Sequence, residues 1–160
     1  MTILGIDPGL KTTGYGFIIF KNQTIRLLET GTINPKRRDL IQNRVNKVYK
    51  ILGDLITQYK PDCLVLEKLY THYHYPTTAG ILGHVRGVIC LLCAQKNVPL
   101  VEYPVKRIRK ALTGNGNASK LQTQRVVAQI LKINEQQLTL DASDALALAL
   151  GFIHMHSRKI

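Results

Sequence analysis

The order of apolar segments along the chain constrains its fold more than any other feature. Three strand-like segments follow one another closely, at residues 2–6, 14–20 and 24–34. The turn Asp7-Pro8-Gly9 separates the first two, and only a few residues separate the second from the third. Because short turns join antiparallel neighbours, these segments predict a three-stranded meander.

Helices and strands alternate after the meander. Apolar residues recur at three- and four-residue steps over 39–59, which predicts an amphipathic helix. The later expected elements are a strand at 63–66, a helix at 76–96, a strand at 98–103, a short basic helix at 104–112, and helices at 120–132 and 141–156. Ser119 or Asn117 is the candidate cap of the helix at 120–132. A meander followed by this alternation predicts one α/β domain with a mixed sheet over residues 1–160.

The charge of the chain favours a polyanionic partner. Lys and Arg total 22 against 10 Asp and Glu, for a net charge of +12. Neutralising phosphates releases counterions, so this excess favours nucleic acid, although a basic protein without such a partner is the alternative. No apolar run reaches the roughly 18 residues that span a bilayer. The chain begins as a strand without a leader, so we expect a cytoplasmic protein and no membrane.

Four of the few acids adjoin apolar segments instead of solvated ones. Asp7 and Glu67 each end an apolar strand, and Asp141 and Asp144 stand three apart at the start of an apolar helix. Asp7 could instead cap a turn, and Asp141 could be a helix N-cap with Asp144 favouring the helix dipole. Because the carboxyl ends of neighbouring strands converge, we expect the four carboxylates to lie together.

Clustered carboxylates require a cation. Unpaired buried carboxylates are costly, and each raises the pKa of the others unless a positive charge neutralises them. Oxygen ligands select hard ions such as Mg²⁺ or Mn²⁺. Two such ions about 3.5–4 Å apart can activate water and stabilise the leaving oxygen of a phosphodiester. The acids and the basic charge together predict metal-dependent hydrolysis of DNA.

Several motifs occur together and in order. They are ILGIDPG at 3–9 with TGYG at 13–16, LVLE at 64–67, LGHVRG at 82–87, GNGNASK at 114–120 and DASDALA at 141–147. The first motif alone occurs in many ribonuclease-H-like proteins. The set, in this order and at these spacings, resembles the RuvC family of bacterial Holliday-junction resolvases across nearly the whole chain.

The resemblance implies a ribonuclease-H-like fold, with a mixed five-stranded sheet flanked by helices. It implies a homodimer that makes paired, symmetric nicks in four-way junction DNA during recombination and repair, with the RuvA–RuvB branch-migration complex as partner. It also implies two Mg²⁺ ions in each active site, with Mn²⁺ as a substitute. Asp7, Glu67, Asp141 and Asp144 match the metal ligands of the family.

Candidate DNA contacts follow from the same resemblance. Lys110 and Lys120 match basic residues near the scissile phosphate, and Tyr70 matches an aromatic residue that stacks on bases. Lys106, Arg107 and Arg109 complete a dense basic run beside the Gly/Asn loop at 113–119. We predict that this run contacts DNA; a solvated helix face is the alternative.

Two further patterns concern packing. Cys90 and Cys93 form a CxxC without further zinc ligands nearby, so we expect both to be small buried side chains of a helix. Gly80, Gly83 and Gly87 fall on one stripe of the same helix. Glycine costs about 1 kcal/mol in a helix interior, so we expect close packing of another backbone, within the subunit or across a dimer.

Other functions remain as alternatives. A ribonuclease-H-like nuclease acting on RNA or unbranched DNA would keep the carboxylates, whereas a non-catalytic nucleic-acid-binding domain would not need all four. An actin-like sugar kinase is excluded by the length and by the missing phosphate loops. His72 and His74 lie in a His/Tyr-rich segment that departs from the family pattern; we expect solvated or DNA-facing histidines there.

Overall fold

A computed structural model describes residues 1–68 and 76–156. The strands are β1 (Thr2–Asp7), β2 (Thr13–Lys21), β3 (Thr24–Ile33), β4 (Cys63–Glu67) and β5 (Leu100–Tyr103). The helices are α1 (Ile41–Tyr59), α2 (Pro76–Lys96), α3 (Val105–Thr113), α4 (Lys120–Leu131) and α5 (Leu140–His156), with a 3-10 turn at Glu135–Gln137. Among the described residues, no helix is both long enough and apolar enough to cross a membrane.

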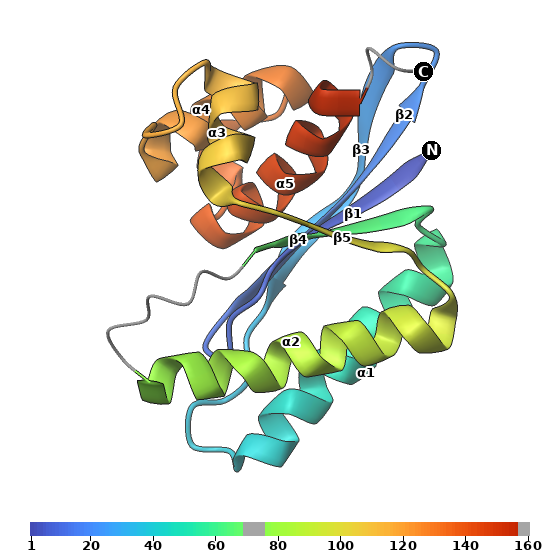
Figure 1. The fold of residues 1–160 in the computed structure, drawn as a ribbon, viewed down its shortest axis with the longest axis vertical. Coiled ribbons are helices and arrows are strands. Elements are labelled where there is room, and N and C mark those ends of the chain that lie inside the picture. Colours follow the sequence, from blue (N-terminus) through green and yellow to red (C-terminus); the bar gives the residue numbers. More distant parts are fainter. Residues whose placement is uncertain (69–75, 157–160) are drawn as a thin grey trace.

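The five strands form one mixed sheet in the order β3-β2-β1-β4-β5 (Figure 1). The meander β1–β2–β3 is antiparallel, and β4 and β5 add to β1 in parallel. This arrangement confirms the predicted mixed five-stranded sheet flanked by helices. The two strands that end in acids, β1 and β4, therefore run in the same direction.

Helices cover both faces of the sheet. Helices α1 and α2 lie on one face, and α3, α4 and α5 lie on the other (Figure 1). Side chains of one strand alternate between the two layers: Leu4 and Ile6 pack in the core with α1 and α2, whereas Ile3 packs in the core with α5. The sheet is buried on both sides, which explains why its central strands read as continuous apolar runs.

Helix α5 lies unusually close to β1 and β2 because glycines face it. A Cβ atom at Gly5 would overlap the carbonyl oxygen of Ala145, and one at Gly14 would overlap the carbonyl oxygen of Asp141. Glycine within a strand often marks such a close approach of another backbone. The contact fixes the first turns of α5 against the ends of the meander strands.

The sequence-based elements agree with the structure apart from small differences. The strand expected at 98–103 begins at Leu100, because the Val98 amide instead donates to the Cys93 carbonyl at 2.9 Å and closes the end of α2. The 3-10 turn was not expected. Ser119, not Asn117, caps α4: its hydroxyl accepts from the Gln122 amide at 3.1 Å, and the Gln122 side chain returns a bond to the Ser119 amide.

Two packing predictions are wrong in part. Cys93 is buried, as expected, but Cys90 is exposed. Among the described residues the glycine stripe has no close neighbour: a Cβ atom at Gly80, Gly83 or Gly87 would meet no such atom within 4 Å. The alternative prediction, that the stripe packs against another subunit of a dimer, stays a prediction.

Candidate active site

Three carboxylates line one cavity at one end of the sheet. Ile6 of β1 lies opposite Leu66 of the parallel strand β4, so Asp7 and Glu67 follow at the same level. Helix α5 adds Asp144 from its first turns. These three side chains line a cavity of about 280 Å³, together with Arg109 of α3 and Lys120 of α4, among other residues.

Asp141 lies one turn earlier on α5 and lines a neighbouring cavity. Positions three apart differ by about 4.5 Å along a helix, so the two aspartates share a side of α5 without facing the same hollow. Asp141 is not the N-cap. The helix begins at Leu140, and the Thr139 hydroxyl accepts a hydrogen bond from the Ala142 amide at 3.3 Å.

Asp7 is not a turn cap either. The turn after β1 is closed by the Thr13 hydroxyl, which donates to the Gly9 carbonyl at 2.6 Å. Within the described part of the chain, the Asp7 carboxylate accepts no hydrogen bond from this turn. Its position is therefore not explained by local backbone geometry.

The environment of Asp7 and Glu67 opposes the ionisation of these two carboxyl groups. Burial is the main reason that the pKa of Asp7 is raised from 3.8 to about 7, and the charge of Asp144 is the second. Glu67 and Asp141 act in the same direction, whereas Lys120 opposes them. Burial and Asp144 also raise the pKa of Glu67. The cavity thus concentrates more negative charge than its own cations neutralise.

Lys120 places a positive charge beside the carboxylate of Asp144. Its ammonium forms an ion pair with the Asp144 carboxylate. Burial lowers the pKa of Lys120, but the hydrogen bond and the charge of Asp144 outweigh it and the net shift is upward. Because Lys120 directly follows the Ser119 cap, the start of α4 fixes where this cation reaches the carboxylates.

The donor set suits a hard metal ion. Asp7, Glu67 and Asp144 offer only carboxylate oxygens, the ligands that Mg²⁺ and Mn²⁺ prefer. Among the described residues, no three acidic, histidine or cysteine side chains converge closely enough to enclose a metal ion as the chain stands.

The predicted basic run divides into two groups. Arg109 lines the cavity and lowers the pKa of Glu67 against the opposing effect of burial. Arg107 lies 5.4 Å over the Tyr103 ring, and Lys106 and Lys110 are exposed outside the cavity. Tyr70, His72 and His74 lie outside the described residues.

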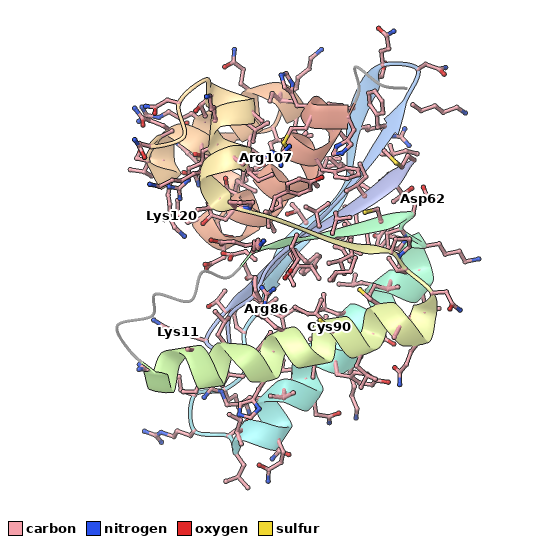
Figure 2. All side chains as sticks on the ribbon, viewed as in Figure 1. Lys11, Asp62, Arg86, Cys90, Arg107 and Lys120 are labelled. Atoms are coloured by element: carbon pink, nitrogen blue, oxygen red, sulfur yellow. The ribbon has the colours of Figure 1, made fainter. Side chains whose placement is uncertain are left out.

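Sequence reasoning missed Arg86, which contacts the same strand end. Its Nη1 atom donates to the Glu67 carbonyl oxygen at 2.7 Å, and its Nη2 atom pairs with Glu102 of β5. Figure 2 shows Arg86 between α2 and the sheet. A signal was present: Arg86 is the only charged residue over 76–95, an otherwise apolar and small-residue segment.

Comparison with known proteins gives the family. The family model described as crossover junction endodeoxyribonuclease RuvC matches residues 3–152. A protein of that name from Rhodopirellula baltica is 40% identical over 92% of this chain and 83% of its own length. Another from Petrotoga mobilis is 39% identical over 99% of this chain and 96% of its own length.

Solved structures agree in fold. Thermus thermophilus RuvC in complex with a Holliday junction substrate has a TM-score of 0.88 at 22% identity, covering 99% of this chain and 96% of that one. The yeast mitochondrial Holliday junction resolvase has a TM-score of 0.67 at 15% identity, covering 98% and 79%. With the family model and relatives at 39–40% identity, these likenesses establish that the chain belongs to the RuvC family of crossover junction endodeoxyribonucleases.

Proposed function

We propose that this chain is a Holliday-junction resolvase, an endonuclease that makes paired nicks in four-way DNA junctions during recombination and repair. One observation carries the proposal: in a chain of the RuvC family, Asp7, Glu67 and Asp144 line one cavity with Arg109 and Lys120. Carboxylates can hold a metal ion, and cations attract a phosphate, so both requirements of phosphodiester hydrolysis meet in one place.

The carboxylates would hold the metal. We assign Asp7, Glu67 and Asp144, with Asp141 beside them, to two Mg²⁺ ions, for which Mn²⁺ would substitute. The bound ions would act as Lewis acids and lower the pKa of water. The chain itself contributes half-buried carboxylate oxygens, and the pKa values of Asp7 and Glu67 are raised by their partial burial and by the charge of Asp144.

Two groups of basic residues would bind different phosphates of the DNA. Arg109 and Lys120 adjoin the carboxylates, so we assign them to the phosphate that is cut. Lys106, Arg107 and Lys110 are assigned to flanking phosphates, which add affinity without sequence preference. For Tyr70, base stacking rests on the resemblance alone.

A dimer would match the symmetry of the substrate. One active site cuts one strand, and a two-fold dimer presents two sites to a junction that is itself nearly two-fold symmetric. The glycine stripe of α2 is exposed and free of close neighbours within the described chain, so it can accept a partner helix. We propose RuvA–RuvB as the partner complex and the cytoplasm as location.

A nicking assay on matched DNA substrates tests the proposal. A four-way junction and a linear duplex of the same sequence are incubated with Mg²⁺ or with excess chelator. The junction should be cut symmetrically in Mg²⁺ only, and the duplex should remain intact. Equal cutting of the duplex or of an RNA–DNA hybrid would favour another ribonuclease-H-like nuclease, and cutting in chelator would exclude the metal mechanism.

A further inference from the structure

A second cavity adjoins the carboxylates. It has a volume of about 760 Å³ and lies between the loop after β1, the start of α1 and the N-terminal part of α2. Residues close together in the chain line the two cavities. Asp7 and Asp144 line the first cavity, and their near neighbours Pro8 and Asp141 line the second. They are neighbouring hollows beside the same acidic residues.

Three cations from separate segments line this second cavity. Lys11 comes from the loop after β1, Arg37 from the turn before α1, and Arg44 from α1 itself. Among the described residues, no carboxylate pairs with any of the three within 4.0 Å. Asp141 is the one acid among the described residues that line the cavity, so positive charge predominates there. Figure 2 shows Lys11 and Lys120 on the same side of the molecule, beyond the end of the sheet.

Arg44 is held in place but incompletely bonded. Its Nη2 atom donates to the Leu10 carbonyl oxygen at 2.8 Å, which fixes the guanidinium against the loop that follows Asp7. Its Nε atom is buried and has no hydrogen-bond partner among the described residues. The loop that follows Asp7 therefore positions this guanidinium at the wall of the second cavity.

We propose that this second cavity binds a backbone phosphate of the DNA strand being cut, next to the scissile phosphate, through Lys11, Arg37 and Arg44. The inference rests on the proposed function, because it takes the scissile phosphate to lie at Asp7 and Asp144. The strand continues from that point in both directions, and the second cavity lies along one of them. Guanidinium groups match phosphate oxygens in a planar fork, and the lysine adds a point charge.

A structural role for Arg44 alone is the competing explanation. In that case the arginine only ties α1 to the loop after β1, and the cavity binds nothing. Lys11 and Arg37 distinguish the two accounts, because both side chains are exposed and neither is needed for the tie to Leu10. Their replacement should leave the fold intact while removing two of the cations that neutralise phosphate.

The test measures binding to uncut junctions in chelator over a series of salt concentrations. For K11A/R37A, the slope of log K against log salt should become shallower by about 0.9 for each phosphate that the variant no longer neutralises. Lys21→Ala is the control, because Lys21 is exposed at the end of β2, whereas Asp7 lies opposite Gly14 near the start of that strand. A slope equal to that of the control would overturn the proposal.

Phosphate neutralisation then locates the binding position. Single methylphosphonates are placed at positions flanking the cut site, and each junction is bound by wild type and by K11A/R37A. At one or two phosphates beside the scissile one, neutralisation should weaken binding by wild type but not by the variant. If no position shows this difference, the site is wrong. Because the assay uses uncut DNA, a failure to cleave junctions would overturn the proposed function without deciding this test.

Discussion

The guanidinium of Arg86 donates a hydrogen bond to the backbone carbonyl of Glu67 over 2.7 Å. The same guanidinium pairs with Glu102, which lies opposite Leu66 in the neighbouring strand. One side chain of α2 therefore ties the ends of β4 and β5 together directly behind a proposed metal ligand. Groups that orient ligands from behind commonly change activity 10–100-fold when removed.

Arg86→Ala should therefore slow junction cleavage by about ten-fold or more at saturating enzyme, while junction affinity stays near that of wild type. The reason is that the strand end bearing Glu67 loses its anchor, whereas the basic residues that bind DNA remain. Single-turnover rates and binding isotherms measure the two effects separately. Arg125→Ala, which breaks an exposed pair with Glu135, is the matched control. An unchanged cleavage rate would remove Arg86 from the site.

Gly14→Ala should abolish most cleavage and destabilise the chain by about 1–3 kcal/mol. Its Cβ atom would overlap the Asp141 carbonyl oxygen, so α5 must move and carry Asp141 and Asp144 with it. Gly53→Ala is the control, because its Cβ atom meets only the Leu92 side chain at 3.4 Å. Urea unfolding and cleavage rates check both effects. Wild-type activity in Gly14→Ala would show that the close approach of α5 is not required.

Gly83→Leu should break the dimer without unfolding the subunit. The position is exposed, and a Cβ atom there meets no described atom within 4 Å, so the larger side chain is accommodated in a monomer. Sedimentation should give a mass near twice 18.0 kDa for wild type and a monomer for the variant, with unchanged circular dichroism. A variant that is still dimeric, or a monomeric wild type on junction DNA, would contradict the interface.

The stability of the metal-free protein should fall as pH rises through about 7. Burial and Asp144 raise the pKa of Asp7 from 3.8 to about 7, so the folded chain holds the proton more tightly than the unfolded chain. The resulting stabilisation is fully present below about pH 4 and is lost as Asp7 ionises, with an upper limit of about 4 kcal/mol. In chelator, urea unfolding at about pH 4 and about pH 8 should show this loss for wild type and much less for Asp7→Asn. Parallel changes in both proteins would contradict it.

Local sequence patterns were sufficient to predict most of the helices and strands and two of the site carboxylates. The helices and strands were predictable because each has a clear periodicity and clear turn residues, and α5 was predictable as a buried helix because it is apolar nearly all round. Asp7 and Glu67 stood out because an acid at the end of an apolar strand has no solvation role. Their meeting followed from the shared direction of β1 and β4.

The remaining site features depend on long-range contacts. Nothing near Arg86 in the sequence indicates that it reaches Glu67, and nothing near Arg44 indicates that it reaches Leu10. The separation of Asp141 from Asp144 into neighbouring cavities likewise depends on how α5 lies against the glycines of the sheet. Gly14 within a strand was the available signal for that approach.

Half-buried carboxylates at the end of the sheet, Asp7 among them, are proposed to carry out the metal-dependent cleavage of four-way junctions. The most direct measurement is the single-turnover rate of cleavage of a four-way junction in Mg²⁺ by wild type, Asp7→Asn and the exposed control Asp54→Asn. Asp7→Asn should bind the junction as wild type does yet show no measurable cleavage, while Asp54→Asn should cleave at the wild-type rate. Cleavage by Asp7→Asn at near the wild-type rate would contradict the account.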